Sequence, residues 1–176
     1  MDILLINGSP RRGGNTEIMA DAFIDGARQS GNTVTKINLS ETKVKPCVGC
    51  DYCQAHDGVC VQKDGMSDVF AAMDKADMVV LASPIYSYGL TAQIAAVLNR
   101  LYARDSIGYH PSGCALLLDS YSPDVFSAAV EQYRELAAYL KWKDRGFVAI
   151  SGMVEKGAMK TSPELPRVVD FARSFR

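Results

Sequence analysis

One short segment, KPCVGCDYCQAHDGVC, gathers thiols that could do chemistry. It contains four of the five cysteines in the chain: Cys47, Cys50, Cys53 and Cys60. The amino-terminal run MDILLING is too short for a signal peptide, so we expect a cytoplasmic protein in a reducing compartment, where disulfide frameworks are rare. Clustered thiols in that setting indicate metal binding or redox chemistry.

A second segment, NGSPRRGGNTE, has the composition of a phosphate-binding loop ahead of a helix. Three glycines permit close approach of the backbone: Gly8, Gly13 and Gly14. The side-chain donors, beside two arginines at the helix start, are Ser9, Asn15 and Thr16. An ordinary glycine-rich turn is the alternative. A Walker A loop is excluded because Gly14 stands where the lysine must be, and G-x-G-x-x-G is absent. The segment suits a terminal phosphate monoester better than a pyrophosphate.

A third segment, ASPIYSYGLTAQ, offers what a flat heterocycle needs. It supplies an apolar edge, stacking rings and a point of close backbone approach: Pro84, Ile85, Tyr86, Tyr88 and Gly89. Either tyrosine taken alone is more often a packing residue than a cofactor contact. The nearby segment DSYSPD could add Ser120 or Tyr121 to the same site.

These segments need elements that bring them together, and the chain alternates short apolar runs with helical periodicity. Buried parallel strands are predicted at 3–6, 34–39, 78–82, 115–118 and 147–150. Helix starts are predicted at Thr91, at Ser122 with Pro123, and at Ser162 with Pro163. The alternation predicts a doubly wound α/β sheet with helices on both faces, whose ligands bind outside the carboxyl ends of the strands.

Length and charge exclude several classes of function. The 176 residues, 48% of them hydrophobic, suffice for a single domain over 1–176. A formal net charge of -1, without charge blocks, argues against nucleic acid as a partner. No apolar run approaches 18 residues, so we expect no membrane span.

GSPRRGGNTE followed by ADMVVLASPIYSYGLTAQIAAVLNR resembles the NAD(P)H-dependent FMN reductases of the flavodoxin-like proteins. The similarity runs from residue 1 to about residue 104. It implies strand order 2-1-3-4-5, bound FMN, and a homodimer or tetramer in which a neighbouring subunit closes the flavin pocket. By this resemblance the phosphate positions are Ser9, Arg11, Asn15 and Thr16, and the flavin-ring positions are Pro84, Ile85, Tyr86, Ser87 and Gly89. Asn99 departs from the commoner acidic residue before Arg100, and we expect this pair to be structural.

The cysteine spacing C-x2-C-x2-C-x6-C resembles the compact motif of iron-sulfur flavoproteins, a branch of the same family. Two-residue spacers let consecutive thiolates face a common centre, which suits a [4Fe-4S] cluster near the flavin. Zinc and a metal-free set of thiols remain open as alternatives. We expect His56 to be a solvated loop residue, His110 a turn residue and Cys114 a core residue.

The predicted function is an FMN-dependent oxidoreductase. Electrons would pass from NAD(P)H or a ferredoxin-like donor to a small acceptor such as a quinone or flavin, with the flavin rather than a side chain as the catalytic group. The alternatives are a cluster-free NAD(P)H-dependent FMN or quinone reductase, a flavodoxin-type electron carrier, and a flavin- or metal-sensing module. A carrier is disfavoured by the charge of -1, because flavodoxins are usually markedly acidic.

Overall fold

The computed structural model describes residues 1–175, which form a five-stranded parallel sheet of order β2-β1-β3-β4-β5. The strands are β1 (Asp2–Asn7), β2 (Thr33–Asn38), β3 (Met78–Pro84), β4 (Gly113–Asp119) and β5 (Lys143–Ile150). In register, Ile3 of β1 lies between Val34 of β2 and Met78 of β3. The predicted doubly wound sheet and its strand order are confirmed, and each predicted strand overlaps an observed one.

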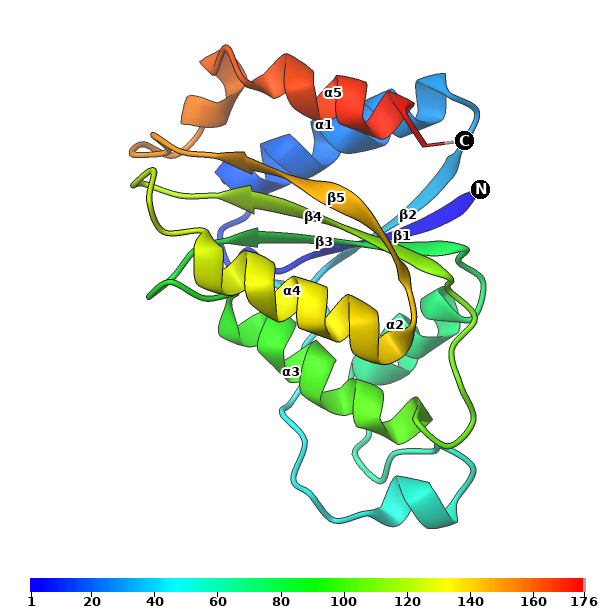
Figure 1. Ribbon diagram of the computed structural model, residues 1–176. Helices are drawn as coiled ribbons and strands as arrows, with labels where there is room; N and C mark the ends of the chain where they lie inside the picture. Colours follow the sequence, from blue (N-terminus) through cyan, green and yellow to red (C-terminus); the bar gives the residue numbers. More distant parts are fainter. Residues whose placement is uncertain (176) are drawn as a thin grey trace.

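Helices cover both faces of the sheet (Figure 1). On one face lie α1 (Asn15–Gln29) and α5 (Leu165–Arg173), and on the other lie α2 (Met66–Met73), α3 (Ala92–Leu101) and α4 (Ser127–Leu140). Three short 3-10 turns in the described residues are η1 (Tyr52–Ala55), η2 (Tyr102–Arg104) and η3 (Ala158–Thr161). Because both faces are covered, β3 and β4 are buried along their whole length, which explains their continuously apolar sequences.

One of the three predicted helix starts is confirmed. Thr91 caps α3, where its hydroxyl accepts from the backbone N–H of Ile94. The start at Ser122 was wrong, because the chain stays irregular until Ser127 and the Ser122 carbonyl accepts from the hydroxyl of Ser120. The start at Ser162 was also wrong: its hydroxyl accepts from the N–H of Glu164 in a turn, and α5 begins only at Leu165.

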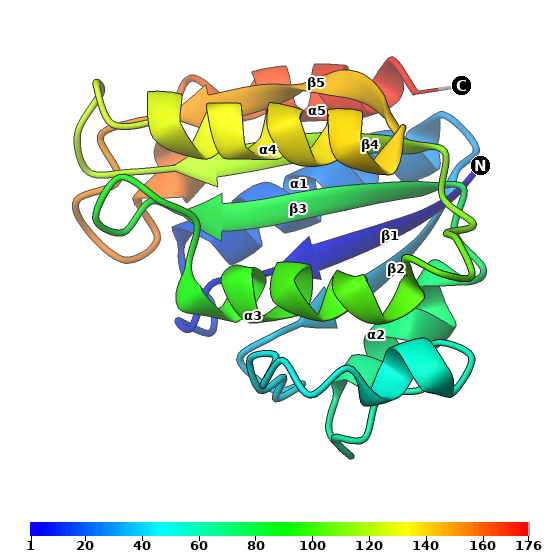
Figure 2. The ribbon, with the colours of Figure 1, turned by 60° about the horizontal axis from the view of Figure 1, so that its bottom comes forward.

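Because the strands are parallel, the sheet has a carboxyl edge, where all the strands end, and an amino edge, where they all begin. The carboxyl ends of β1, β3 and β4 point the same way, and the loops that follow them lie at one edge (Figure 2). α3 runs back across the sheet from this carboxyl edge, where the Thr91 hydroxyl donates to the Gly8 carbonyl at 3.0 Å. It ends at the amino edge, where Arg104 pairs with Asp74 just before β3 begins. No helix within residues 1–175 has the length and apolar character needed to span a membrane.

Candidate functional site

A cavity of about 270 Å³ opens at the carboxyl edge, where β1, β3 and β4 end. All four predicted phosphate residues line it: Ser9, Arg11, Asn15 and Thr16. Of the predicted ring residues, Pro84, Ile85 and Tyr86 line it as well. The fold therefore brings together two segments that are about 70 residues apart in the sequence.

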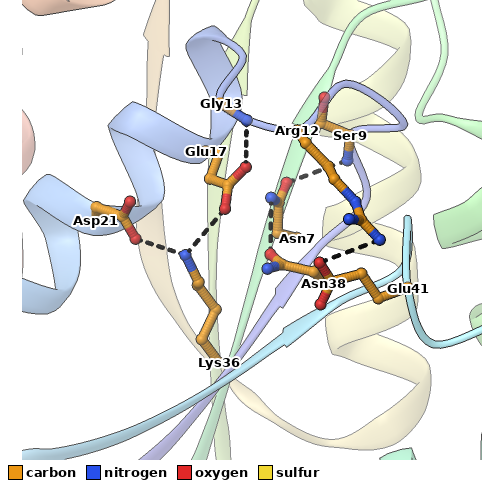
Figure 3. Close-up of polar contacts among 9 residues, drawn as sticks. All are labelled: Asn7, Ser9, Arg12, Gly13, Glu17, Asp21, Lys36, Asn38 and Glu41. Atoms are coloured by element: carbon orange, nitrogen blue, oxygen red, sulfur yellow. Dashed lines mark hydrogen bonds and ion pairs between the residues drawn. The ribbon is translucent and has the colours of Figure 1, made fainter.

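The phosphate loop, residues 8–14, is shaped by the strand that precedes it. Asn7, at the end of β1, accepts from the Ser9 N–H through Oδ1 at 3.1 Å and donates to Asn38 of β2 at 3.1 Å (Figure 3). The Ser9 hydroxyl accepts from the Arg11 N–H at 3.2 Å, which leaves its own proton for a ligand. Sequence reasoning missed Asn7, because a strand-terminal amide carries no local signal of this role.

Glu17 fixes the other end of this loop. Its carboxylate accepts from the Gly13 N–H at 2.6 Å, and Lys36 of β2 lies 3.3 Å away and also contacts Asp21 at 2.7 Å (Figure 3). Burial raises the pKa of Glu17, but the bonds from Gly13 and Lys36 outweigh it and hold the pKa below its usual value. The Gly13 N–H is thus occupied, and the first-turn N–H groups of α1 are left to meet an anion.

The two arginines of the loop point in different directions. Arg12 lies 3.4 Å from Glu41, and both side chains are exposed (Figure 3). Arg11 lines the cavity, and its charge acts on Asp119. Arg11 therefore faces the cavity whereas Arg12 faces solvent, and the contact of Arg11 with a phosphate stays a prediction.

Asn15 uses its side-chain amide to hold the loop after β5. Its Nδ2 donates to the Glu155 carbonyl at 2.9 Å, and its Oδ1 accepts from the N–H groups of Gly157 and Met159 at 2.9 and 3.2 Å. These three bonds bring Lys156 to the cavity. A direct bond from Asn15 to a phosphate stays a prediction.

A buried carboxylate, which sequence reasoning missed, also faces the cavity. Asp119 ends β4 and is 5% exposed, and Thr16 donates its hydroxyl proton to Asp119 Oδ1 at 2.5 Å. Burial raises the pKa of Asp119 to about 6, although the Thr16 bond and the Arg11 charge act to lower it. In the sequence, the only indication of this role is that Asp119 directly precedes Ser120, which was predicted as a possible site residue.

The ring side of the cavity is an apolar edge followed by a tight turn. The Ile85 N–H donates to the Asp119 carbonyl at 2.9 Å, which ties this edge to β4. Tyr86 and Gly89 exchange backbone hydrogen bonds, and between them Ser87 and Tyr88 have φ values of 49° and 66°. Ser87 and Gly89 thus lie in the turn at the rim, outside the residues that line the cavity.

The cysteine loop, residues 46–63, leaves β2 at the carboxyl edge but does not stay there. Its turn η1 packs on η2 at the amino edge: Gln54 Nε2 donates to the Tyr102 carbonyl at 3.0 Å, and the Tyr102 hydroxyl donates to Asp51 at 3.0 Å. Figures 1 and 2 show this segment, in cyan, projecting beyond α2 and α3. The sequence predicts thiols near the flavin, but the tip of the loop lies at the opposite, amino edge, because η1 contacts η2 there.

The four thiols differ in exposure and are not assembled as a ligand set. Cys47 and Cys50 are exposed, Cys60 is half-buried and Cys53 is buried. Within residues 1–175, no three His, Cys, Asp or Glu side chains lie close enough together to hold a metal ion. The donor chemistry nevertheless suits a metal cluster, and the Gly49 N–H already donates to Cys47 Sγ at 3.4 Å. His56 is exposed and stacks on Tyr52 with ring centres 3.7 Å apart.

A buried ion pair closes the base of the cysteine loop. Asp64 receives two bonds from Arg100, at 3.0 and 3.3 Å, and one from the Lys45 N–H at 2.8 Å. Burial raises the pKa of Asp64, but these bonds and that from the Met66 N–H lower it below its usual value. Arg100 also donates to the Lys45 carbonyl at 3.0 Å, so its predicted structural role is confirmed.

Comparison with known proteins gives one family and a set of relatives. A family model described as "NADPH-dependent FMN reductase" matches residues 1–153. A protein of Archaeoglobus fulgidus named "Iron-sulfur flavoprotein" is 35% identical over 136 residues, which cover 77% of this chain and 58% of the relative. One of the same name from Methanosarcina thermophila is 34% identical over 100 residues, or 57% of this chain and 52% of the relative. The chain thus spans about half the length of the curated relatives it matches.

Solved structures share the fold at low sequence identity. A NAD(P)H:quinone oxidoreductase from Methanothermobacter marburgensis superposes with a TM-score of 0.75 at 12% identity, covering 98% of this chain and 96% of that chain. An FMN-dependent NADH-azoreductase from Bacillus anthracis, in complex with FMN, gives 0.69 at 13% identity and covers 98% of each chain.

Proposed function

The chain belongs to the NADPH-dependent FMN reductase family, and from this premise we propose that it uses FMN to pass electrons from NAD(P)H or a ferredoxin-like donor to a small acceptor such as a quinone or flavin. The observation that carries the proposal is the cavity at the carboxyl edge. Its walls combine a phosphate loop with the apolar edge formed by Pro84, Ile85 and Tyr86. When bound, FMN supplies the electron-transfer chemistry.

The side chains around the cavity have separate tasks in this scheme. Arg11 and the Ser9 hydroxyl hold the phosphate, together with the first-turn N–H groups of α1. Pro84 and Ile85 would flank the ring on a rigid segment, and the turn of residues 86–89 would lie beside it at the rim. Tyr86, Tyr88 and Tyr121 are 44%, 64% and 70% exposed around the opening. A second copy of the chain would cover these rings, which supports a homo-oligomer as the working assembly.

Binding and turnover of purified protein test this proposal. Mass analysis of released cofactor should identify FMN rather than FAD, because the phosphate loop offers one compact site. The FMN-loaded protein should oxidise NADH or NADPH with a quinone as acceptor. FMN binding without turnover would leave a flavodoxin-type carrier, and failure to bind FMN would overturn the proposal. Light scattering on the FMN-loaded protein measures its oligomeric state.

We further propose that the cysteine loop binds a [4Fe-4S] cluster through Cys47, Cys50, Cys53 and Cys60. The support is the donor set, the N–H···S contact at Cys47, and relatives named iron-sulfur flavoproteins. Binding requires the segment from Cys47 to Cys60 to close, with the base held by Asp64 and Arg100. Free thiols also fit the reducing cytoplasm that we propose as its location.

Anaerobic reconstitution tests the cluster independently of the flavin. About four irons and four sulfides per chain are expected. Cys50→Ala should lose the broad visible absorption and retain FMN, since the phosphate loop lies on another element. Zinc in place of iron in the isolated protein would identify a structural metal site. Reductase activity with no iron, sulfide or zinc incorporated would identify a cluster-free FMN or quinone reductase.

A further inference from the structure

Asp119 places a negative charge in the wall of the proposed phosphate site. It is 5% exposed and shares the cavity with Ser9 and Arg11. A phosphate monoester carries nearly two negative charges at neutral pH. A buried carboxylate beside such a group raises the free energy of binding unless a proton or a cation compensates it.

The hydroxyl of Thr16 is committed to this carboxylate. Thr16 Oγ1 has one proton and donates it to Asp119 Oδ1 at 2.5 Å. While that bond lasts, Thr16 can only accept, so it cannot donate to a phosphate oxygen. If Asp119 carries a proton, the direction reverses: the carboxyl donates to Thr16, and the Thr16 proton becomes free for the phosphate.

The net charge around the cavity also indicates that a bound phosphate dianion requires one added proton. Among the described residues that line it, Arg11 and Lys156 are cationic, Asp119 is acidic, and Tyr86 and Tyr121 contribute phenol groups. A dianionic phosphate would bring this set from one net positive charge to one net negative charge. One added proton restores neutrality, and because burial raises the pKa of Asp119 to about 6, this carboxyl accepts a proton more readily than an exposed aspartate.

We propose that Asp119 takes up one proton from solvent when the FMN phosphate binds, and that this protonation frees the Thr16 hydroxyl to donate to the phosphate dianion. The inference rests on the proposed binding of FMN and adds a proton-linked specificity for a terminal phosphate. The coupling makes FMN affinity fall as the pH rises, because the complex holds one proton more than its separate components.

The test is the pH dependence of binding, with riboflavin as a ligand that lacks the phosphate. Between pH 7 and pH 8 the dissociation constant of FMN should rise about tenfold for the wild type and stay unchanged for Asp119→Asn. Riboflavin binding should not vary with pH in either protein. Calorimetry in buffers of different ionisation enthalpy should give about one proton taken up per FMN for the wild type and about none for Asp119→Asn.

Each contrary result has a distinct meaning. FMN binding by the wild type without proton uptake would overturn the coupling alone, and this measurement decides even if the variant does not fold. A phosphorus NMR shift of bound FMN typical of a monoanion would also overturn it, because the proton would then reside on the phosphate. Absence of FMN binding at every pH would overturn the proposed function and the coupling together.

Discussion

The phosphate loop is tied to buried elements along its length, whereas the cysteine loop is tied only at its base and tip. Asn7, Glu17 and Thr91 each bond the phosphate loop from a strand or a helix. Two thiols of the cysteine loop, Cys47 and Cys50, remain exposed between the Asp64–Arg100 pair and the η1 turn. The proposed anion site is therefore formed in advance by the fold, while the proposed cluster site must close around its metal.

The largest effect is expected at the base of the cysteine loop. Arg100→Ala would leave Asp64 as an uncompensated charge, since the two side chains are 1% and 6% exposed. The free energy of unfolding should fall by about 3–5 kcal/mol in urea denaturation. The matched control is Arg167→Ala, whose pair with Glu164 is exposed and should contribute less than about 1 kcal/mol. Equal losses in the two variants would show that the base does not anchor the loop.

A smaller effect, of opposite sign, is expected in the phosphate site. The pKa of Asp119 is raised from 3.8 to about 6, so its ionisation costs free energy in the folded protein. That cost is absent below pH 4 and grows as the pH rises through about 6. Without FMN, Asp119→Asn should therefore be more stable than the wild type at pH 7, by about 3 kcal/mol, and the difference should vanish near pH 4.

Urea denaturation at pH 4, 5, 6 and 7 measures this difference. Equal stability of the two proteins at pH 7 would show that Asp119 is better solvated or better compensated than its 5% exposure implies. Such a result would mean that the phosphate site, like the cysteine loop, is less rigidly enclosed by the fold than the structure indicates.

The two adjacent arginines offer the next comparison. Arg11→Ala removes a charge-assisted contact worth about 1.5–3 kcal/mol and should weaken FMN binding by about ten- to a hundredfold in a flavin titration. Arg12→Ala removes the same charge from the same loop, but Arg12 pairs with Glu41 in solvent, so its affinity should stay within about threefold of the wild type. Equal losses would indicate a long-range effect of charge rather than a contact made by Arg11.

Local sequence patterns could predict the sheet and the capped helix, but not the long-range anchors. The continuous apolar runs of β3 and β4 and the Thr91 cap are local signals that packing reinforces. The role of Asp119 depends on Thr16, which lies 103 positions away. The path of the cysteine loop depends on Asp64 and Arg100, which are 36 positions apart, and on η2. Such pairings are set by tertiary packing, and no spacing within a segment encodes them.

The smallest effect is expected at an exposed thiol of the cysteine loop. In metal-free protein under reducing conditions, Cys50→Ser should change the free energy of unfolding by less than about 0.5 kcal/mol, because the side chain is exposed. Cys53→Ser should cost more, about 1–3 kcal/mol, because Cys53 is 7% exposed and the change buries a hydroxyl. Urea denaturation of both variants checks this order. A loss above 1 kcal/mol for Cys50→Ser would show that its thiol already holds the loop without metal, and the contrast with the phosphate loop would then disappear.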